Sequence, residues 1–274
     1  MNHLKMTVLV DNTAASPFLC EWGLSILIEA DGAKILLDTG SSGMFAKNAE
    51  QLGIRLSDVQ FGVLSHAHYD HADGMDAFFS LNKTAPFLVR EGSRENCFGL
   101  KDGAMEYIGI KQGFLREFQD RIRYVSGIHE ISDGIWLIPH HTADYSPISR
   151  RNDLYIKRNK AYYPDSFSHE QSLVIDTRAG LAVFSSCSHA GMTNILEDIR
   201  LALGRDDFFA YIGGLHLYKL TDPELSNLCD EIEQSAVDHI FTGHCTGDHA
   251  FSFLHNRLGD RIVPFYSGFI CDIV

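Results

Sequence analysis

The same order of elements occurs twice along this chain, and the repetition limits the folds that it can adopt. The first copy, residues 25–40 (SILIEADGAKILLDTG), places two strand-forming runs around the turn pair Asp31-Gly32, which predicts a β-hairpin. The second copy, residues 172–186 (SLVIDTRAGLAVFSS), turns at residues 178–180. A polar loop, a helical pattern and another apolar strand follow each hairpin. Two such units predict an α/β protein in which two sheets stack with helices on their outer faces.

Apolar spacing and turn residues predict the remaining elements. A helix is expected at residues 44–52, just before Gly53, and another at 221–236, where Thr221 and Glu224 match the capping-box pattern. Residues 75–130 are less legible, with helical spacing around 104–120. A further helix is expected around residues 195–203, and strands at 61–64, 86–89, 135–138, 208–212 and 239–241.

Length and composition indicate one folded unit. The chain has 274 residues, of which 45% are hydrophobic, and it can therefore bury a large core. Helix and strand patterns alternate without a Pro/Gly/Ser-rich linker or a run of charge between them. We expect a single domain over residues 1–274, with two similar halves.

Charge and hydropathy exclude several kinds of partner. The formal net charge is −13, whereas nucleic-acid-binding surfaces rely on clustered Lys and Arg. No apolar segment approaches the roughly 20 residues of a membrane span, and the apolar run near the N-terminus is too short for a signal peptide. We therefore expect no nucleic-acid or membrane partner. The oligomeric state stays open and is compatible with a homo-oligomer.

Cysteine spacing bears on the compartment. The six cysteines show no CxxC pairs, which suits a reducing cytosol better than a disulfide framework. They are Cys20, Cys97, Cys187, Cys229, Cys245 and Cys271. We expect a cytoplasmic protein.

The stretch SHAHYDHADG (65–74) carries three histidines and two aspartates directly after the apolar run at 61–64. Residues i and i+2 of an extended strand end point the same way, so His66 and His68 can present imidazoles to one ion. Asp70 and His71 lie beyond them, where the chain must turn, and can face a second ion. Without cations, such buried groups would cost about 1–3 kcal/mol each. Imidazole and carboxylate ligands suit zinc, iron or manganese better than calcium or magnesium.

Ligands from one loop do not complete two coordination spheres, so other strand ends must contribute. Three later histidines each follow an apolar strand closely: His189 in SCSHAG, His216 in GGLHL and His244 in TGHC. Binding sites of layered α/β folds gather at strand ends. We expect these loops to converge on SHAHYDHADG.

These motifs, together with the repeated hairpin–helix layout, resemble the metallo-β-lactamase superfamily over residues 24–74 and 165–270. Within it, SHAHYDHADG, SCSHAG, GGLHL and TGHCTG resemble the branch of metal-dependent hydrolases that includes an archaeal dihydropterin-forming, dihydropteroate-synthase-like synthase. The resemblance implies a four-layer αβ/βα sandwich of the metallo-β-lactamase type, with a two-metal site at one edge.

The resemblance also implies a set of ligands. Carried over by position, His66 and His68 hold the first metal ion, whereas Asp70 and His71 hold the second. His244 matches the final histidine of the family, on the second ion. Asp38 in LLDTG matches an aspartate that supports the site from behind and is not itself a ligand.

The middle ligands fit the family pattern less well. The counterpart of its Gly-His-Thr loop is Pro139-His140-His141-Thr142, with His141 in register. The strand that should end in a bridging aspartate ends instead in SSCSH (185–189). We favour His189 over His141 as the third ligand of the first ion. Cys187 is either a ligand of the second ion, which would favour zinc, or a buried structural thiol.

The resemblance and the motif together predict a dinuclear metal-dependent hydrolase. A bound metal lowers the pKa of its water from about 15.7 to about 7, which makes hydroxide available at neutral pH. Asp70 can orient this nucleophile and accept its proton. His216 and His141 are the candidates for the acid that protonates the leaving group, and His216 contacts either substrate or metal.

The substrate and the rival functions stay open at this point. Phosphoesters, lactones, thioesters and lactams are all substrates of the superfamily, and the branch resemblance favours a small anionic or pterin-like metabolite. One rival is a di-iron oxidoreductase of the same fold. Another is a non-catalytic regulator that binds metal and ligand.

Residues 145–171 form a long stretch without clear periodicity. They carry five basic side chains, including Arg150 and Arg151, among five tyrosine or phenylalanine side chains. One interpretation is a solvated loop with an embedded strand. The other is an insertion that acts as an active-site lid and brings positive charge to an anionic substrate.

Overall fold

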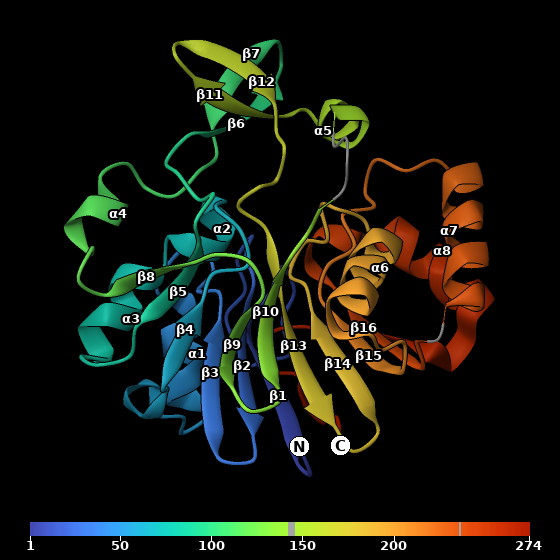
Figure 1. Cartoon of the computed structure of the whole chain (residues 1–274), viewed down its shortest axis with the longest axis horizontal. Helices are drawn as coiled ribbons and strands as arrows, with labels where there is room; N and C mark the ends of the chain where they lie inside the picture. The colour runs from blue at the N-terminus through green and yellow to red at the C-terminus, as the bar shows by residue number, and fades with distance from the viewer. Residues whose placement is uncertain (142–145, 236) are drawn as a thin grey trace.

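The computed structural model describes residues 1–141, 146–235 and 237–274. Two seven-stranded sheets lie face to face, with helices on the outer face of each (Figure 1). The sequence-based expectation of a four-layer αβ/βα sandwich is confirmed. The covering helices are α1 (Met44–Gln51) and α3 (Met75–Leu81) on the first sheet, and α6 (Met192–Leu203), α7 (Asp222–Gln234) and α8 (Asp248–Leu258) on the second.

Each large sheet comes mainly from one half of the chain, except that the last strand, near the C-terminus, joins the first sheet. In spatial order, the first contains β18 (Ile270–Asp272), β1 (Leu4–Val10), β2 (Ser25–Ala30), β3 (Ala33–Leu37), β4 (Phe61–Val63), β5 (Phe87–Arg90) and β8 (Ile122–Val125). The second contains β17 (Ile262–Pro264), β16 (His239–Thr242), β15 (Phe208–Ile212), β14 (Gly180–Phe184), β13 (Gln171–Thr177), β10 (Ile135–Pro139) and β9 (His129–Ser132).

The repeat read from the sequence is present in the strand pairing. In the first half, β2 pairs antiparallel with β3, and β3 then pairs parallel with β4 after α1 crosses over. In the second half, β13 pairs antiparallel with β14, and β14 pairs parallel with β15 after α6. Both copies therefore direct the ends of their parallel strands toward the same edge of the molecule.

Three apolar layers separate the four structural layers. Each buried aliphatic or aromatic side chain in them stabilises the fold by about 1.5–3 kcal/mol relative to exposure. Between the sheets, the layer includes Ile26, Leu173 and Phe184. The layer under the helices of the first sheet includes Phe45 and Phe78, and that of the second includes Ile195, Tyr211 and Leu225.

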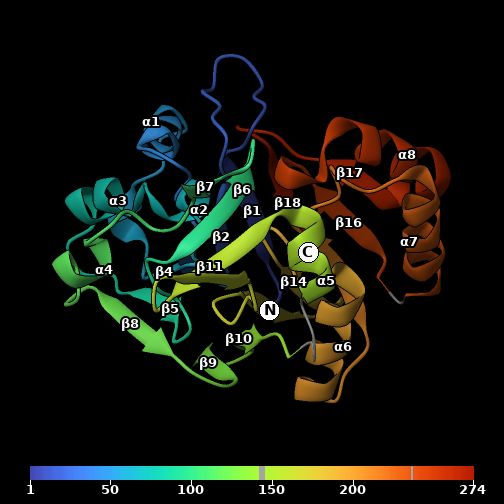
Figure 2. The same ribbon diagram turned by 90° about the horizontal axis from the view of Figure 1, so that it is seen from above.

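A small third sheet lies across the edge where the strands of the large sheets end (Figures 1 and 2). We call it the roof sheet, and the short helix α5 (Ser146–Asn152) precedes its second hairpin. Its strands are, in order, β12 (Ala161–Pro164), β11 (Leu154–Arg158), β6 (Cys97–Lys101) and β7 (Ala104–Tyr107). The roof sheet joins two distant segments, since the paired residues of β6 and β11 are more than 50 positions apart in sequence.

The helical expectation at residues 104–120 is wrong over most of its length. Residues 104–107 form β7, and only α4 (Phe114–Glu117) is helical. The reason is the turn Asp102-Gly103, in which both residues have positive φ angles of 50° and 80°. Such a pair suits a two-residue hairpin, and Lys101 accordingly pairs with Ala104. The Asp-Gly signal was present in the sequence and outweighs weak helical spacing.

Two other expectations concern the borders of the described residues. The capping box of α7 is confirmed, since the backbone N–H of Thr221 donates to Glu224 Oε2 at 2.8 Å. The helix ends at Gln234, and residue 236 of the expected range lies outside the described residues. Residue 145 of the suggested lid lies outside them as well. Among the described helices, none is long and apolar enough to cross a membrane.

Candidate metal centre

The tips of strands from both large sheets converge beneath the roof sheet. The loops after β3 and β4 reach this edge from the first sheet, and those after β14, β15 and β16 reach it from the second. The structure brings together eight residues singled out from the sequence. They are His66, His68, Asp70, His71, Cys187, His189, His216 and His244.

A first group of donors consists of His66, His68 and His189, all of them buried. One nitrogen from each ring lies within 4.8 Å of the others. The ring of His189 lies 4.9 Å from that of His66 and 5.0 Å from that of His68, measured between centroids. The Nε2 atoms of His66 and His68 and both ring nitrogens of His189 have no hydrogen-bond partner among the described residues.

A second group of donors consists of Asp70, His71 and His244. The Nε2 atoms of the two histidines are 3.2 Å apart. Oδ2 of Asp70 lies 3.7 Å from Nε2 of His71 and 3.5 Å from Nε2 of His244. Three donor atoms from two sheets thus surround one small volume.

Cys187 lies between the two groups. Its Sγ atom is 3.3 Å from Nε2 of His71, and it also falls within 4.8 Å of donor atoms of His66 and of His189. A second thiol, that of Cys245, approaches Cys187 with an Sγ–Sγ distance of 3.4 Å. The site therefore offers sulfur beside both donor groups.

Asp38 orients two of the histidines. Its carboxylate accepts hydrogen bonds from the backbone N–H and the hydroxyl of Ser65, both at 2.7 Å. Nδ1 of His71 donates to the same carboxylate at 2.8 Å. Because the Ser65 hydroxyl donates to Asp38, Nδ1 of His66 must donate to Ser65 Oγ, 2.8 Å away. These contacts make Nδ1 a donor in both rings and direct both Nε2 atoms into the site.

His244 is oriented in the same way by Asn12. Its Nδ1 atom lies 3.1 Å from Oδ1 of Asn12, whose amide nitrogen donates to the His244 carbonyl at 3.1 Å. The amide oxygen can only accept, so Nδ1 carries the proton and Nε2 the lone pair. Sequence patterns gave no signal for Asn12, because it belongs to a loop far from the histidine motifs.

The electrostatics favour a cation in the site. Burial, followed by repulsion from neighbouring imidazoles, holds the pKa of His66 and His189 well below 6.5, so these rings are neutral at pH 7. Burial raises the pKa of the Asp70 carboxyl. For His71 burial acts in the opposite direction to Asp70 and Asp38, and the two carboxylates prevail and raise its pKa to about 9. The second group therefore stabilises a positive charge, and unpartnered imidazole nitrogens with a thiol are a donor set that fits transition-metal ions.

The rival third ligand lies elsewhere. The side chain of His141 is exposed, and its backbone N–H donates to Asp198 at 2.9 Å. The neighbouring His140 is buried and lies 3.1 Å from the Ser172 hydroxyl through Nε2. Neither ring belongs to the two donor groups, whereas His189 does. Residue 142 of this loop lies outside the described residues.

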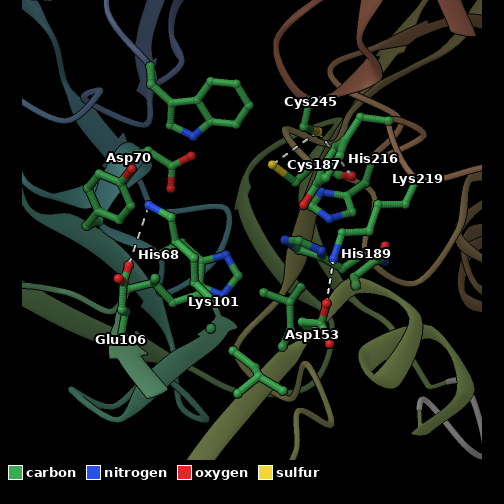
Figure 3. A pocket seen from close by; sticks show the side chains of 18 of the residues that line it. His68, Asp70, Lys101, Glu106, Asp153, Cys187, His189, His216, Lys219 and Cys245 are labelled. Atoms are coloured by element: carbon green, nitrogen blue, oxygen red, sulfur yellow. Dashed lines mark hydrogen bonds and ion pairs between the residues drawn. The ribbon is translucent and has the colours of Figure 1, made fainter. Parts of the chain in front are cut away.

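A cavity of about 270 Å³ opens onto both donor groups (Figure 3). Its aromatic lining comes from Trp22, Tyr69 and Tyr218. Its two lysines lie on opposite walls. Lys101 of the roof sheet pairs with Glu106 at 3.9 Å, and Lys219 pairs with Asp153 at 2.8 Å.

A second cavity of about 240 Å³ lies beside the first and shares Asn152, His189 and His216 with it. Arg151 lines this second cavity and pairs with Glu224 at 3.7 Å. Of the basic side chains in residues 145–171, Arg151 thus lies next to the metal-centre cavity, whereas the lysines inside that cavity come from other segments.

The sequence reasoning missed three residues at the start of β13. His169, Glu170 and Gln171 are almost fully buried and contact the loops that carry the donor groups. Four polar residues, 169–172, directly precede the apolar run at 173–175, and that pattern could have identified them.

Comparisons with known proteins relate the sequence and the fold to one superfamily. Residues 23–154 match the family model described as Metallo-beta-lactamase superfamily. A 7,8-dihydropterin-6-methyl-4-(beta-D-ribofuranosyl)-aminobenzene-5'-phosphate synthase from Methanocaldococcus jannaschii is 26% identical over 98% of this chain and 96% of its own length. An uncharacterized protein of the same organism is 24% identical over 90% of this chain and 92% of its own length.

Solved structures show the same fold over the whole chain. The crystal structure of a metal-dependent hydrolase of the beta-lactamase superfamily superposes with a TM-score of 0.83 at 28% identity, covering 98% of both chains. A diphosphatase of the PhnP family has a TM-score of 0.53 at 15% identity, covering 98% of this chain and 97% of its own. The second likeness concerns the fold alone.

Proposed function

We propose that this chain, which belongs to the metallo-β-lactamase superfamily, is a dinuclear metal-dependent hydrolase that acts on small anionic metabolites. One observation carries the proposal. Two adjacent groups of buried donors come from strand tips of both sheets, and His68, Asp70, His189 and His244 of these groups line one cavity. Among the described residues, ring nitrogens of all three histidines in the first group have no hydrogen-bond partner. The similar structure described as a metal-dependent hydrolase supports the same class of reaction.

Each donor group would hold one ion. His66, His68 and His189 form the first site, and Asp70, His71 and His244 form the second. Cys187 lies close enough to both groups to serve the second ion or to bridge the pair. Because a thiolate and several imidazoles suit zinc, we propose zinc as the metal, with iron or manganese as alternatives.

Bound metal ions would lower the pKa of water and polarise a carbonyl or phosphoryl oxygen of the substrate. The protein supplies orientation and proton transfer. Asp70 directs its carboxylate into the cavity (Figure 3), where it can orient the attacking water and accept its proton. His216 lies 4.4 Å from His189 between ring centroids and faces the same cavity, so it is our candidate for protonating the leaving group. His141 is exposed and does not line the cavity.

The walls of the cavity favour an anionic, partly planar substrate. Lys101 and Lys219 lie on opposite sides, each paired with an acidic residue that an anionic substrate would displace, and the aromatic side chains offer flat apolar surface. The archaeal relative is named for a compound that contains a dihydropterin and a phosphate. We therefore propose a phosphoester, lactone or pterin-like compound, covered during turnover by the roof sheet and residues 146–171.

A second candidate function is a synthase activity, because the archaeal relative carries that name. The same cavity and donors would serve it. The two functions differ in what they consume, since a hydrolase turns over a single ester or lactone in water, whereas a synthase needs two partners to form a bond. Assays with single substrates and with pairs therefore separate them.

The test begins with metal content. Purified protein loaded with Zn²⁺ and freed of excess metal should contain close to two ions per chain by mass spectrometry. His68→Ala should lose metal and hydrolysis of generic phosphodiester or lactone substrates together. His249→Ala is the matched control, because that histidine is exposed and pairs with Asp222 away from the cavity. Full hydrolytic activity in metal-free protein would contradict the proposal.

A further inference from the structure

The chain passes between the two ligand-bearing loops at one point, residues 169–171. Here it leaves the roof sheet and enters β13, an interior strand of the second large sheet (Figure 1). All three residues are buried, with an exposure of 2% or less. We call residues 169–171 the clasp, because they bond to a loop on each side.

On one side the clasp holds the loop that carries His66 and His68. The backbone N–H of Gln171 donates to the carbonyl of Ser65 at 2.9 Å, and its side-chain amide donates to the carbonyl of Leu64 at 2.9 Å. Between the two histidines, the backbone N–H of Ala67 donates to Nδ1 of His169 at 3.1 Å. Three hydrogen bonds therefore connect this loop to the clasp.

On the other side the clasp holds the loop that carries His189. Oε1 of Glu170 accepts the backbone N–H of His189 at 2.8 Å, and Oε2 accepts that of Ala190 at 3.0 Å. Hydrogen bonds from amides to a carboxylate are shorter and stronger than neutral ones. A single buried side chain thus binds the backbone N–H groups of both His189 and Ala190.

His169 acts in this arrangement as a scaffold and not as a further metal ligand. Its ring forms a compact group with His68, Cys97 and Asp165, which by composition also resembles a metal site. Because Nδ1 accepts the Ala67 N–H, Nε2 must carry the proton, and it donates to Asp165 at 3.1 Å. A protonated nitrogen has no lone pair for a metal ion.

We propose that the clasp sets the spacing between the two loops of the first donor group, and that Glu170 is the positioning residue for His189. This inference rests on the proposed metal-dependent function. Metal ligands must be held within about 0.5 Å of productive geometry, and loss of such support commonly costs about 10–100-fold in metal affinity.

The clasp predicts an asymmetry between the two ions. Glu170 contacts the loop of His189, which belongs only to the first group. The second group is oriented by other residues, Asp38 and Asn12. Loss of the Glu170 carboxylate should therefore weaken binding of the first ion and leave binding of the second ion unchanged.

Glu170→Gln is the informative variant. The amide is nearly the same size but offers one acceptor where the carboxylate offers two, so its NH₂ group must face a backbone N–H. We expect one Zn²⁺ to bind as in the unchanged protein and the other to bind about 10–100-fold more weakly. Competition titration with a chromophoric chelator measures both affinities without reference to activity.

Glu95→Gln is the matched control. Glu95 also accepts two backbone N–H groups, those of Gly113 and Leu115, but it lies at α4, outside the metal-centre cavity. Its variant should bind both ions normally. Should Glu170→Gln fail to fold by circular dichroism, Glu170→Asp replaces it, because the shorter carboxylate keeps both acceptors and should weaken the same single ion less severely.

The outcomes separate this inference from the proposed function. If the unchanged protein binds two ions and the Glu170 variant binds one of them more weakly, the result supports both the clasp and the proposed function. Two unchanged affinities in the variant, or equal weakening of both ions, would overturn the clasp while leaving the dinuclear centre intact. Failure of the unchanged protein to bind transition metal would overturn the proposed function and the clasp with it.

Discussion

Nε2 of His71 and Nε2 of His244 lie 3.2 Å apart, although 173 residues separate them in sequence. His71 follows β4 of the first sheet and His244 follows β16 of the second, so the contact joins the two halves of the molecule. Both rings place their other nitrogen on an oxygen, and two lone pairs would therefore face each other. A proton or a metal ion must lie between them, and the nearby Asp70 favours that positive charge.

This relationship makes Asp38 a sensitive position. Asp38→Asn removes the charge that holds Nδ1–H of His71, and the new NH₂ group must face one of three donors. We expect loss of the second ion and a destabilisation of about 1–3 kcal/mol for the unpaired buried donor. Metal analysis and chemical denaturation measure the two effects.

A matched variant controls for the backbone at this position. Asp38 has a φ of 57°, a region that asparagine tolerates, so strain does not account for the expected loss. Asp31 shares this feature, with a φ of 44°, and also accepts backbone N–H groups, but on the exposed hairpin turn. Asp31→Asn should keep both metal ions. A normal metal content in Asp38→Asn would show that Asp38 does not support the centre.

The fold could be predicted largely from local patterns. The hairpins at 25–40 and 172–186 and the helix capped by Thr221 are defined by neighbouring residues, and each forms where expected. The roof sheet could not be predicted, since β6 and β11 pair across more than 50 residues and neither strand has a strong apolar pattern. Long-range pairing of half-exposed strands leaves little trace in a single sequence.

The candidate site shows the same division. The histidines of SHAHYDHADG were visible because several donors occur within ten residues, and their clustering in the structure follows from strand geometry. Glu170 and Asn12 were not visible, because each acts through a backbone or side-chain contact with a distant loop. The choice between His189 and His141 required coordinates, since both follow strands of the same sheet.

His140 gives a prediction for stability against pH. Burial, followed by repulsion from His141 and Arg90, lowers the pKa of His140 from 6.5 to about 3. In the unfolded chain the ring takes up a proton near pH 6.5, whereas the folded ring stays neutral. Its contribution to stability is therefore complete above pH 6.5 and is lost as the pH falls toward 3, by up to about 1.4 kcal/mol per pH unit.

The measurement compares the free energy of unfolding between pH 7 and pH 4 in the unchanged protein and in His140→Gln, both without metal. Glutamine can still reach the Ser172 hydroxyl but does not titrate. The variant should show a shallower loss of stability on acidification. Parallel pH dependences in the two proteins would show that His140 is protonated in the folded state.

The lysines of the cavity give a prediction for substrate charge. Lys219→Ala should raise KM for an anionic substrate about fivefold, because a half-exposed ion pair is worth roughly 1 kcal/mol or less. KM for a neutral lactone and kcat should change little. Lys101→Ala should have a smaller effect, since its side chain is 70% exposed and its ion pair with Glu106 is 3.9 Å long.

Lys47→Ala is the control for net charge, because Lys47 lies exposed on α1 outside the cavity. The difference between Lys219→Ala and the unchanged protein should shrink in high salt, as screening weakens exposed charges. Equal KM values for the anionic substrate in all three variants would exclude a role for these lysines in binding.

Whether the Cys187 thiolate binds metal determines which metal ion the centre prefers. Its sulfur lies 3.3 Å from Nε2 of His71 and reaches donors of both groups. If it is a ligand, the cobalt-substituted protein should show a thiolate-to-cobalt absorption band in the near ultraviolet, and Cys187→Ser should abolish it. Cys229→Ser should keep the band, because Cys229 packs in the apolar layer under α7.

Cys245 is the alternative thiolate ligand that the experiment must distinguish from Cys187, since the two sulfur atoms are only 3.4 Å apart. Persistence of the band in Cys187→Ser and its loss in Cys245→Ser would assign the ligand to the other thiol and leave Cys187 structural. If Cys187 is the ligand, Cys187→Asp should retain two ions without the band, because a carboxylate can replace the sulfur as an anionic donor. Oxygen in place of sulfur should also raise the relative affinity for manganese and iron over zinc.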